Sequence, residues 1–321
     1  MKVLITGVTG QDGYFLAREY LRSDASVVGT TRGGAAAEAR SIKELGSHPN
    51  FNLMVLDLRD QAKVNRLLAS FQPNVICHLA ADSSVSESFS MPEKVIVSTV
   101  QSTISLLNGM IEHCPDAKLM NAASSECFGG AMEPITELTC FNPKSPYAIS
   151  KCASSYLVRS YRATHNIRAQ NLFYFNHESH LRGENFVTKK LVRHAHECAT
   201  GGRVLLPYGD LSVVRDWGLA REYMELTKLI GLSHFDEDYV VATGKSVSLM
   251  ELAKAVFAYF GEDFQSCVSQ QSVIKRPVEI NQTIADPSKV LNDFNWTPTS
   301  DLSAIARELC EGFLGDLKSK S

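Results

Sequence analysis

A strand, a glycine-rich turn and a helix follow one another at the N-terminus, and they constrain the fold more than any other feature of the sequence. The apolar run Lys2–Thr6 predicts a buried strand, and Asp12–Ser23 predicts a helix. Glycine permits the tight turn and a close approach of backbone to phosphate, while the helix N-terminus offers N–H groups to an anion. The expected ligand is a dinucleotide pyrophosphate. Its contacts would come from Gly7, Thr9, Gly10, Gln11, Asp12 and Gly13.

The remainder of the first half alternates short apolar runs with longer helical periods, which is typical of a doubly wound parallel sheet. Further strands are expected at Ser26–Thr30, Phe51–Leu56, Asn74–Leu79, Lys118–Ala122 and Arg168–Phe173. Further helices are expected at Gln61–Phe71, Pro92–His113 and Pro146–His165. The predicted fold class is therefore α/β, with a Rossmann-type doubly wound parallel sheet.

After residue 175 this rhythm breaks, which predicts a smaller, partly interleaved α/β substrate domain. Helices are expected at Phe186–Ala199, Trp217–Gly231, Leu249–Phe260 and Leu302–Leu317, and strands at Arg203–Leu206 and Tyr239–Ala242. We expect residues 1–175, with about 213–245, to form the nucleotide-binding domain, and 176–212 with 246–321 to form the substrate domain. Ligands of such folds bind at the carboxyl ends of the strands, so the site is expected in the crevice between the two parts.

The composition bears on several classes of function. A chain of 321 residues, 44% hydrophobic and 21% charged, suits a soluble enzyme, and a net charge of −3 argues against nucleic acid as a partner. No run approaches the ~20 apolar residues that span a bilayer, and no signal-peptide pattern is present, so no membrane and a cytoplasmic location are expected. The eight cysteines lack the spacing of a metal site, so no metal is expected and they are interpreted as packing residues.

Residues that follow the second, third and fourth strands are expected to line the rest of a dinucleotide site. Arg32 follows the second strand, where a guanidinium can bind the 2′-phosphate of NADP, so NADP is favoured and NAD stays open. Asp57 and Leu58 follow the third strand and are expected to contact adenine. The small residues of Leu79-Ala80-Ala81-Asp82-Ser83 would let a nicotinamide ribose lie against the backbone, whereas His78 is expected to belong to the core.

Tyr147 and Lys151 are four residues apart near the start of a helix that Ser145 can cap. This spacing places both on one helix face, where the ammonium and the helix dipole would stabilise a phenolate. Such a tyrosine can remove a hydroxyl proton while hydride leaves the same carbon. Ser124 and Glu126 follow the fifth strand, and the carboxylate indicates that an elimination accompanies the hydride transfer.

These residues resemble an extended short-chain dehydrogenase/reductase and, more narrowly, the GDP-mannose 4,6-dehydratase family. The similarity runs over nearly the whole chain, and the narrower resemblance rests on the glycine turn and on long motifs of the second half. Those motifs are Asn176-His177-Glu178-Ser179, Arg182-Gly183, Asn185-Phe186-Val187-Thr188-Lys189-Lys190, Gly209-Asp210-Leu211, Arg215-Asp216-Trp217-Gly218, Ala242-Thr243-Gly244 and Arg276-Pro277-x-Glu279.

The resemblance implies a lyase that converts GDP-mannose to a 4-keto-6-deoxy sugar with a tightly bound NADP. Tyr147 would be the base in the oxidation at C4, and Lys151 would hold its phenolate and the nicotinamide ribose. Glu126 would take the C5 proton while the C6 hydroxyl leaves as water, and Ser124 stands where the family usually has a threonine. Hydride would then return to C6, with no net consumption of cofactor.

The resemblance also implies the remaining ligand contacts and the assembly. The cofactor would contact Tyr147, Lys151, His177 and Arg182. The GDP-sugar would be held by Ser83, Ser124, Glu126, Asn176, Asn185, Lys190, Gly209, Arg215, Arg276 and Glu279. A homodimer is implied, in which the helices expected at 92–113 and 146–165 pair across the interface, or a tetramer.

Several alternatives stay open. Cys127-Phe128 and His180 depart from the aliphatic-Tyr and Pro that are usual in the family, so a GDP-manno-heptose or another GDP-hexose fits the same chemistry. An NAD(P)-dependent nucleotide-sugar reductase or epimerase would share the Tyr147 and Lys151 pair. A cofactor-binding regulator without catalysis would keep the fold, although the presence of Glu126 beside that pair argues against it.

Overall fold

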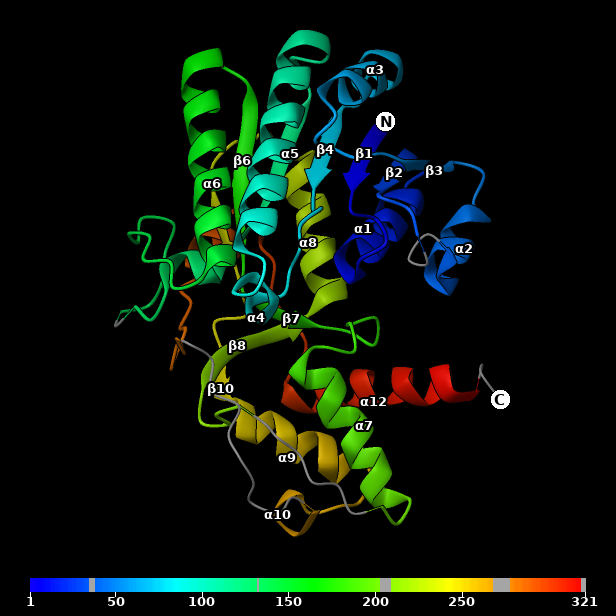
Figure 1. The fold of residues 1–321 in the computed structure, drawn as a ribbon, viewed down its shortest axis with the longest axis vertical. Helices are drawn as coiled ribbons and strands as arrows, with labels where there is room; N and C mark the ends of the chain where they lie inside the picture. Colours follow the sequence, from blue (N-terminus) through cyan, green and yellow to red (C-terminus); the bar gives the residue numbers. More distant parts are fainter. Residues whose placement is uncertain (35–37, 132, 203–208, 268–277, 319–321) are drawn as a thin grey trace.

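The computed structural model describes residues 1–34, 38–131, 133–202, 209–267 and 278–318, and a seven-stranded parallel sheet is its centre. The strands lie in the order β3-β2-β1-β4-β5-β6-β9 (Figure 1). They are β1 Lys2–Thr6, β2 Ser26–Thr31, β3 Phe51–Val55, β4 Val75–His78, β5 Lys118–Ser124, β6 Arg168–Tyr174 and β9 Tyr239–Val241. The strand order reverses between β1 and β4, where such sheets bind ligands at their carboxyl edge. The predicted doubly wound fold is confirmed.

Helices cover both faces of this sheet (Figure 1). One face carries α3 Gln61–Phe71, α5 Pro92–His113 and α6 Pro146–His165, and the other carries α1 Gln11–Leu21, α8 Ala220–Leu232 and α11 Ser288–Phe294. In β1, Val3 and Ile5 belong to the core on the α1 side, whereas Leu4 belongs to the core on the α3 side. Successive side chains point to opposite faces and both faces are buried, so the strand is apolar throughout.

Short elements complete this part of the molecule. They are α2 Arg40–Gly46, α4 Val85–Ser88 and the 3₁₀ turn η2 Ser125–Phe128. Both α4 and η2 follow the carboxyl ends of strands, β4 and β5 respectively, so they lie at the edge where the expected site is located.

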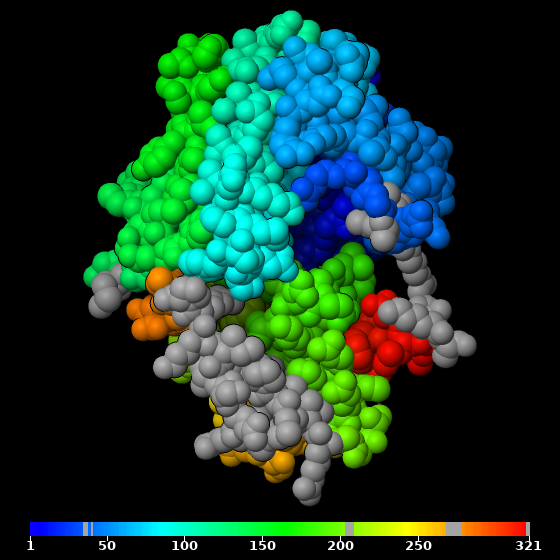
Figure 2. Space-filling model, viewed as in Figure 1, coloured from blue at the N-terminus to red at the C-terminus, as the bar shows by residue number. Residues whose placement is uncertain are grey.

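A smaller three-stranded sheet lies beyond this carboxyl edge, with the order β10-β8-β7. Its strands are β7 Asn176–Glu178, β8 Val214–Leu219 and β10 Ser246–Ser248. Around it α7 Val187–Ala199, α9 Leu249–Tyr259, α10 Phe264–Cys267 and α12 Leu302–Lys318 build a separate hydrophobic core. Figure 2 shows a hollow between this part and the blue and cyan N-terminal part, with the dark-blue N-terminal segment on its floor.

The prediction of a helix at Trp217–Gly231 is wrong about where the helix begins. Trp217 and Leu219 belong to β8, and the helix begins at Ala220. β8 pairs with both β7 and β10, so tertiary hydrogen bonding overrides the helical pattern read from the apolar residues. β7 and β10 have three residues each, too few to produce a recognisable period. The expected strand Arg203–Leu206 lies outside the described residues.

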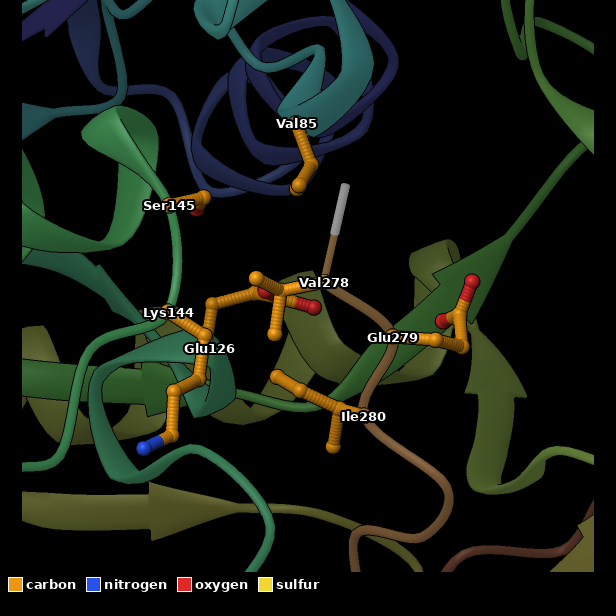
Figure 3. Close-up of a pocket in the computed structure, with 7 residues that line it drawn as sticks. All are labelled: Val85, Glu126, Lys144, Ser145, Val278, Glu279 and Ile280. Atoms are coloured by element: carbon orange, nitrogen blue, oxygen red, sulfur yellow. The ribbon is translucent and has the colours of Figure 1, made fainter. Parts of the chain in front are cut away.

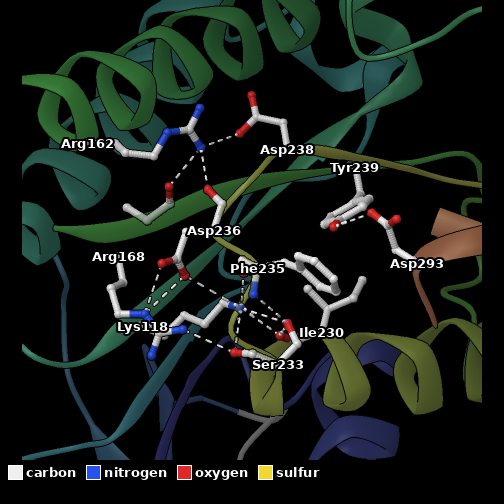
Figure 4. Close-up of polar contacts among 11 residues, drawn as sticks. Lys118, Arg162, Arg168, Ile230, Ser233, Phe235, Asp236, Asp238, Tyr239 and Asp293 are labelled. Atoms are coloured by element: carbon white, nitrogen blue, oxygen red, sulfur yellow. Dashed lines mark hydrogen bonds and ion pairs between the residues drawn. The ribbon is translucent and has the colours of Figure 1, made fainter. Parts of the chain in front are cut away.

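A buried lysine joins the far end of the large sheet to the loop after α8 (Figure 4). The Lys118 side chain at the start of β5 is 1% exposed. Its Nζ donates to the carbonyl oxygens of Ile230 at 2.7 Å, of Ser233 at 3.4 Å and of Phe235. Ile230 lies in the last turn of α8, where carbonyl groups lack helical partners. The ammonium, which also lies 3.8 Å from Asp236, therefore holds the end of α8 against the sheet.

A second buried group fixes the entry into β9. The Asp238 carboxylate accepts from Arg159 Nε at 2.7 Å, from Arg162 Nη1 at 2.8 Å and from the Asn171 backbone N–H at 2.9 Å. Burial alone would raise the pKa of Asp238, but the guanidinium groups outweigh it and lower that pKa. The carboxylate therefore stays charged and ties α6, β6 and β9 together.

Replacing Lys118 by methionine keeps the aliphatic stem but removes the ammonium donor to the Ile230, Ser233 and Phe235 carbonyls. The Ile230 carbonyl still accepts from Ser233 and the Ser233 carbonyl from Arg168, so the Phe235 carbonyl is the most affected. We expect the Lys118→Met variant to lose about 1 to 3 kcal/mol of unfolding free energy, measured by urea denaturation. Lys63→Met is the matched control, because the Lys63 side chain is 55% exposed in its pair with Asp60 and its loss should change stability by less than about 0.5 kcal/mol. Equal effects for the two variants would contradict the role given to Lys118.

Candidate active site

The glycine turn lies between the ends of β2 and β4. The Gly7 N–H donates to the Thr30 carbonyl at 3.0 Å, and a Cβ on Gly7 would lie 2.8 Å from the Ala80 Cα. Gly7 also has φ +72°, which disfavours any side chain, and a Cβ on Gly13 would lie 2.5 Å from the Gly7 carbonyl oxygen. Gly10 begins α1 without a side-chain cap, so the first-turn N–H groups can bind an anion. This cradle fits a dinucleotide pyrophosphate.

The first two residues of α1, Gln11 and Asp12, contact the part of the molecule around the small sheet. Gln11 Nε2 donates to the His177 carbonyl at 3.0 Å and Gln11 Oε1 accepts from Ser179 Oγ at 2.8 Å. The Asp12 carboxylate lies 2.9 Å from His177 Nε2, while His177 Nδ1 lies 2.7 Å from the Phe175 carbonyl. Both imidazole nitrogens face acceptors, so the geometry favours the imidazolium form. The start of α1 is thereby joined to β7.

The Asp12 and His177 pair shifts both titrations. Burial lowers the pKa of His177, but the Asp12 carboxylate outweighs burial and raises that pKa overall. Burial likewise raises the pKa of Asp12, and the imidazolium reverses this to a net lowering, with a contribution from Arg182. Arg182 also interacts electrostatically with Tyr147. Its guanidinium stacks on the Phe186 ring, 3.8 Å from the ring centre. Its Nε lies 3.4 Å from the Glu178 carboxylate.

Charged residues in the loops after β2 and β3 form ion pairs. Arg32, whose side chain is 60% exposed, lies 2.9 Å from the Asp82 carboxylate after β4. Asp57 accepts from Arg59 at 2.6 Å, and these hydrogen bonds lower the pKa of Asp57 to about 2. Leu58 is buried in the core under α3, so its side chain contributes to packing.

The segment after β4, where a nicotinamide ribose is expected to lie, is accessible to solvent. Leu79, Ala80 and Ala81 are half-buried and Ser83 is exposed. His78 is buried, with its ring 2.9 Å from the Thr6 hydroxyl, and burial lowers its pKa to about 3. The prediction that His78 belongs to the core is confirmed.

The expected Tyr147 and Lys151 pair lies at the start of α6, where Ser145 Oγ caps the helix by accepting from the Ala148 N–H at 3.1 Å. Lys151 Nζ donates to the Ala122 carbonyl at 2.6 Å and lies 5.9 Å from the Tyr147 ring centre. Burial lowers the pKa of Lys151 to about 8. Burial also raises the pKa of Tyr147, while a hydrogen bond with Ser124 lowers it. Tyr147, Lys151 and Ser124 thus lie together, where β5 ends and α6 begins.

Glu126 stands in η2, where its N–H donates to Ser124 Oγ at 3.2 Å. Its neighbours Cys127 and Phe128 are fully buried in the core, whereas Glu126 is half-buried and lines a small pocket. The pocket is completed by Val85, Lys144, Ser145, Val278, Glu279 and Ile280. Figure 3 shows Glu126 beside Val278 in this pocket, with the Lys144 ammonium directed away. A carboxylate therefore opens to a pocket two residues beyond Ser124.

The expected sugar and nucleotide residues are only partly brought together. Arg215 Nη2 donates to the Ile280 carbonyl at 2.7 Å and lies 3.5 Å from the Glu279 carboxylate, both on the segment that lines the Glu126 pocket. Asn185 Nδ2 donates to Glu87 Oε1 at 2.8 Å, which spans from the second part to α4. Asn176, Lys190 and Gly209 are half-buried, and Arg276 lies outside the described residues.

The sequence analysis did not predict several residues of the site. Val85, Lys144 and Ile280 line the Glu126 pocket, and Thr6 supports the Ala80 N–H through its hydroxyl at 3.2 Å. For Val85 and Lys144 the available signal was position, because each lies a few residues from a predicted site residue. Ile280 directly follows Glu279, a predicted site residue, but its approach to η2 depends on how the part around the small sheet lies against the large sheet.

Two further properties concern the part of the chain that the structure describes. No group of three or more His, Cys, Asp or Glu residues there could hold a metal ion. None of the helices there combines the length and the apolar character needed to cross a membrane.

Comparison with known proteins bears on this site. The family model described as GDP-mannose 4,6 dehydratase matches residues 4–309. The chain belongs to the GDP-mannose 4,6-dehydratase family. Named members are similar over almost the whole chain. GDP-mannose 4,6 dehydratase 2 of Arabidopsis thaliana is 35% identical over 96% of this chain and 85% of its own length. The Yersinia enterocolitica GDP-mannose 4,6-dehydratase is 30% identical over 99% and 95%.

Solved structures show the same fold. The dTDP-glucose 4,6-dehydratase of Bacillus anthracis, in complex with NAD, superposes with a TM-score of 0.87 at 18% identity, covering 99% of this chain and 98% of that chain. The UDP-glucose 4-epimerase of Thermus thermophilus, also with NAD, gives 0.85 at 24% identity, covering 98% and 99%. The fold of this family is thus shared by dehydratases and epimerases of nucleotide sugars.

The Asp12 and His177 pair makes a pH-dependent contribution to stability. Because the pKa of His177 is raised, the contribution is full below its ordinary value of 6.5 and is lost as the pH rises through the raised pKa. Because the pKa of Asp12 is lowered, the contribution is full above 3.8 and is lost at lower pH. We expect Asp12→Asn to lose about 1 to 2 kcal/mol of unfolding free energy near pH 6, and less at higher pH.

Urea denaturation across this pH range measures the effect. Asp60→Asn is the matched control, because Asp60 caps α3 by accepting from the Lys63 N–H and asparagine caps equally well. A loss for Asp12→Asn that stays constant with pH would contradict the assigned ion pair.

Proposed function

We propose that this protein is a GDP-sugar 4,6-dehydratase, a lyase that converts GDP-mannose, or a close relative such as a GDP-manno-heptose, to its 4-keto-6-deoxy derivative. The observation that carries the proposal is the position of Glu126. Its side chain lines a pocket, its N–H donates to Ser124, and Ser124 in turn interacts with Tyr147. A hydride transfer alone needs Tyr147 and Lys151 but no such carboxylate.

In the oxidation half of the reaction, Tyr147 accepts the proton of the C4 hydroxyl. A nicotinamide dinucleotide held by the glycine turn would supply the hydride acceptor for C4 and the hydride donor for C6. Burial opposes the phenolate that Tyr147 needs, and the Ser124 hydrogen bond favours it. Lys151, held at 2.6 Å by the Ala122 carbonyl, adds its charge below a pKa of about 8. Above that pH the ammonium loses its proton and its support of the phenolate.

In the elimination half, Glu126 accepts the C5 proton. A C5–H beside the new C4 carbonyl is far more acidic than one in the intact sugar, and a positioned carboxylate typically adds ~10²- to 10⁴-fold. Protonated Glu126 can then supply the proton with which the C6 hydroxyl leaves as water. Tyr147 releases the C4 hydroxyl proton to solvent, and a solvent-derived proton reaches C5 as hydride returns to C6. The product therefore carries no net change in oxidation state.

The remaining ligand contacts are proposals of the same kind. Arg32 would bind the 2′-phosphate of NADP, with NAD as the alternative, and Asp57, His177 and Arg182 would contact the cofactor. Arg215 and Glu279 would contact the GDP-sugar from the segment beside Glu126. Arginine suits bidentate phosphate contacts, which supports Arg215. The part around the large sheet would bind the cofactor, and the part around the small sheet would bind the GDP-sugar.

Surface and thiol chemistry support two further proposals. Apolar side chains are exposed on α5 at Val97 and on α6 at Ile149 and Tyr156, which suits pairing of these helices in a homodimer, with a tetramer as the alternative. All eight cysteines are free, which suits the reducing cytoplasm.

Incubation with a GDP-sugar distinguishes the candidate reactions. We expect GDP-mannose, or one GDP-sugar of a panel, to lose the mass of one water and form a 4-keto product without net change in NADPH absorbance. Mass spectrometry and absorbance measure both quantities. Stoichiometric loss of NADPH would identify a reductase, and a product of unchanged mass would identify an epimerase. UDP-, CDP- and dTDP-sugars serve as controls for the nucleotide.

Glu126→Gln separates the two halves of the reaction. We expect this variant to oxidise C4 and accumulate reduced nicotinamide, while dehydration falls ~10²- to 10⁴-fold because the C5 proton has no base. In D₂O the wild-type protein should place deuterium at C5, and the variant should not. Glu44→Gln, on α2, is the control and should behave as wild type. Normal turnover by Glu126→Gln would show that the carboxylate is misassigned.

A further inference from the structure

An ion pair joins the loops that follow β2 and β4 at the carboxyl edge of the large sheet. Arg32 Nη2 lies 2.9 Å from the Asp82 Oδ1 atom. These residues belong to different loops, after β2 and after β4, and β1 lies between those strands. The pair therefore connects the two neighbours of β1 across the end of β1 itself.

The contacts of the turn fix this placement. Gly7 donates to the Thr30 carbonyl on one side and abuts the Ala80 backbone on the other. Arg32 and Asp82 each follow these contact residues by two positions. The turn whose N–H groups can bind a pyrophosphate is thus flanked by the same two chain segments that the ion pair joins.

Both members of the pair are held in place. The second Asp82 oxygen accepts from Ser98 Oγ on α5 at 3.3 Å, so the carboxylate is anchored to the sheet side. Arg59 hydrogen-bonds Asp57 and contributes a weaker electrostatic attraction to Asp82. On the other side Gly33 has φ +89°, a left-handed conformation in which the chain turns away immediately after Arg32.

We propose that the Arg32–Asp82 ion pair is a strap that closes over the dinucleotide pyrophosphate and slows its release, which makes Asp82 a positioning residue for the cofactor. A guanidinium has five donors, so Arg32 can keep Asp82 and still face a phosphate. Retention suits a reaction in which hydride leaves and returns within one turnover. The inference rests on the proposed dinucleotide site and not on the dehydration itself.

A competing arrangement makes the opposite prediction. If Asp82 merely occupied Arg32, it would compete with the 2′-phosphate of NADP. Removing the Asp82 charge would then tighten NADPH and leave NADH unchanged. A strap instead predicts faster release of both cofactors when the charge is removed, because the pyrophosphate is common to them.

The experiment measures cofactor release from the full chain without any sugar. Protein loaded with NADPH or with NADH is mixed with excess oxidised cofactor, and the loss of nicotinamide fluorescence gives the release rate. We expect Asp82→Asn to release both cofactors about two- to fivefold faster, the size typical of an exposed ion pair. Asp82→Glu should restore slow release. Ser98→Ala should accelerate it less than Asp82→Asn.

Salt provides a second readout. Raising the ionic strength from about 0.05 M to about 0.5 M should accelerate release from the wild type more than from Asp82→Asn, because only the wild type has the pair to screen. Glu44→Gln, which removes an exposed pair with Arg18, should release cofactor like the wild type. Unchanged release by Asp82→Asn, or slower release of NADPH alone, would overturn the strap. Failure of dehydration with these rates intact would overturn the proposed function instead.

Discussion

The backbone contact at Gly7 is the constraint on which the rest of the structure depends. A side chain there would collide with Ala80, and its positive φ disfavours every residue except glycine. This contact brings the turn between β2 and β4 and directs the N-terminus of α1 into the crevice. From that N-terminus Gln11 and Asp12 then bind β7. One tight turn therefore exposes N–H groups that can bind an anion and also joins the two parts of the molecule.

The proposed catalytic residues lie at the same carboxyl edge of the sheet, after β5. β5 ends at Ser124, η2 turns Glu126 toward a pocket, and α6 begins with Tyr147. Cys127 and Phe128, where the chain departs from the usual family residues, are buried in the core next to Glu126. Burial opposes charge on both Tyr147 and Lys151, which suits a site whose charges are balanced only when ligands are bound.

Much of this could be predicted from the sequence because its signals are local. The large sheet follows from apolar runs and helical periods, and the cap of α6 follows from Ser145. Asp82 illustrates the limit, because the sequence places it at a strand end but does not pair it with Arg32, fifty positions away. The start of α8 was misplaced for the same reason, since Trp217 belongs to a strand only when β7 and β10 lie beside it.

By itself the sequence determined the doubly wound fold, the glycine cradle and the family resemblance. Strand periodicity, glycine spacing and motif order are local properties of the sequence, so they can be recognised without the structure. Only the tertiary structure decided which residues meet across it. The Asp12 contact with His177, the approach of Ile280 to Glu126 and the Arg32–Asp82 bridge each join distant segments. Such contacts depend on the packing of whole layers, which no local pattern specifies.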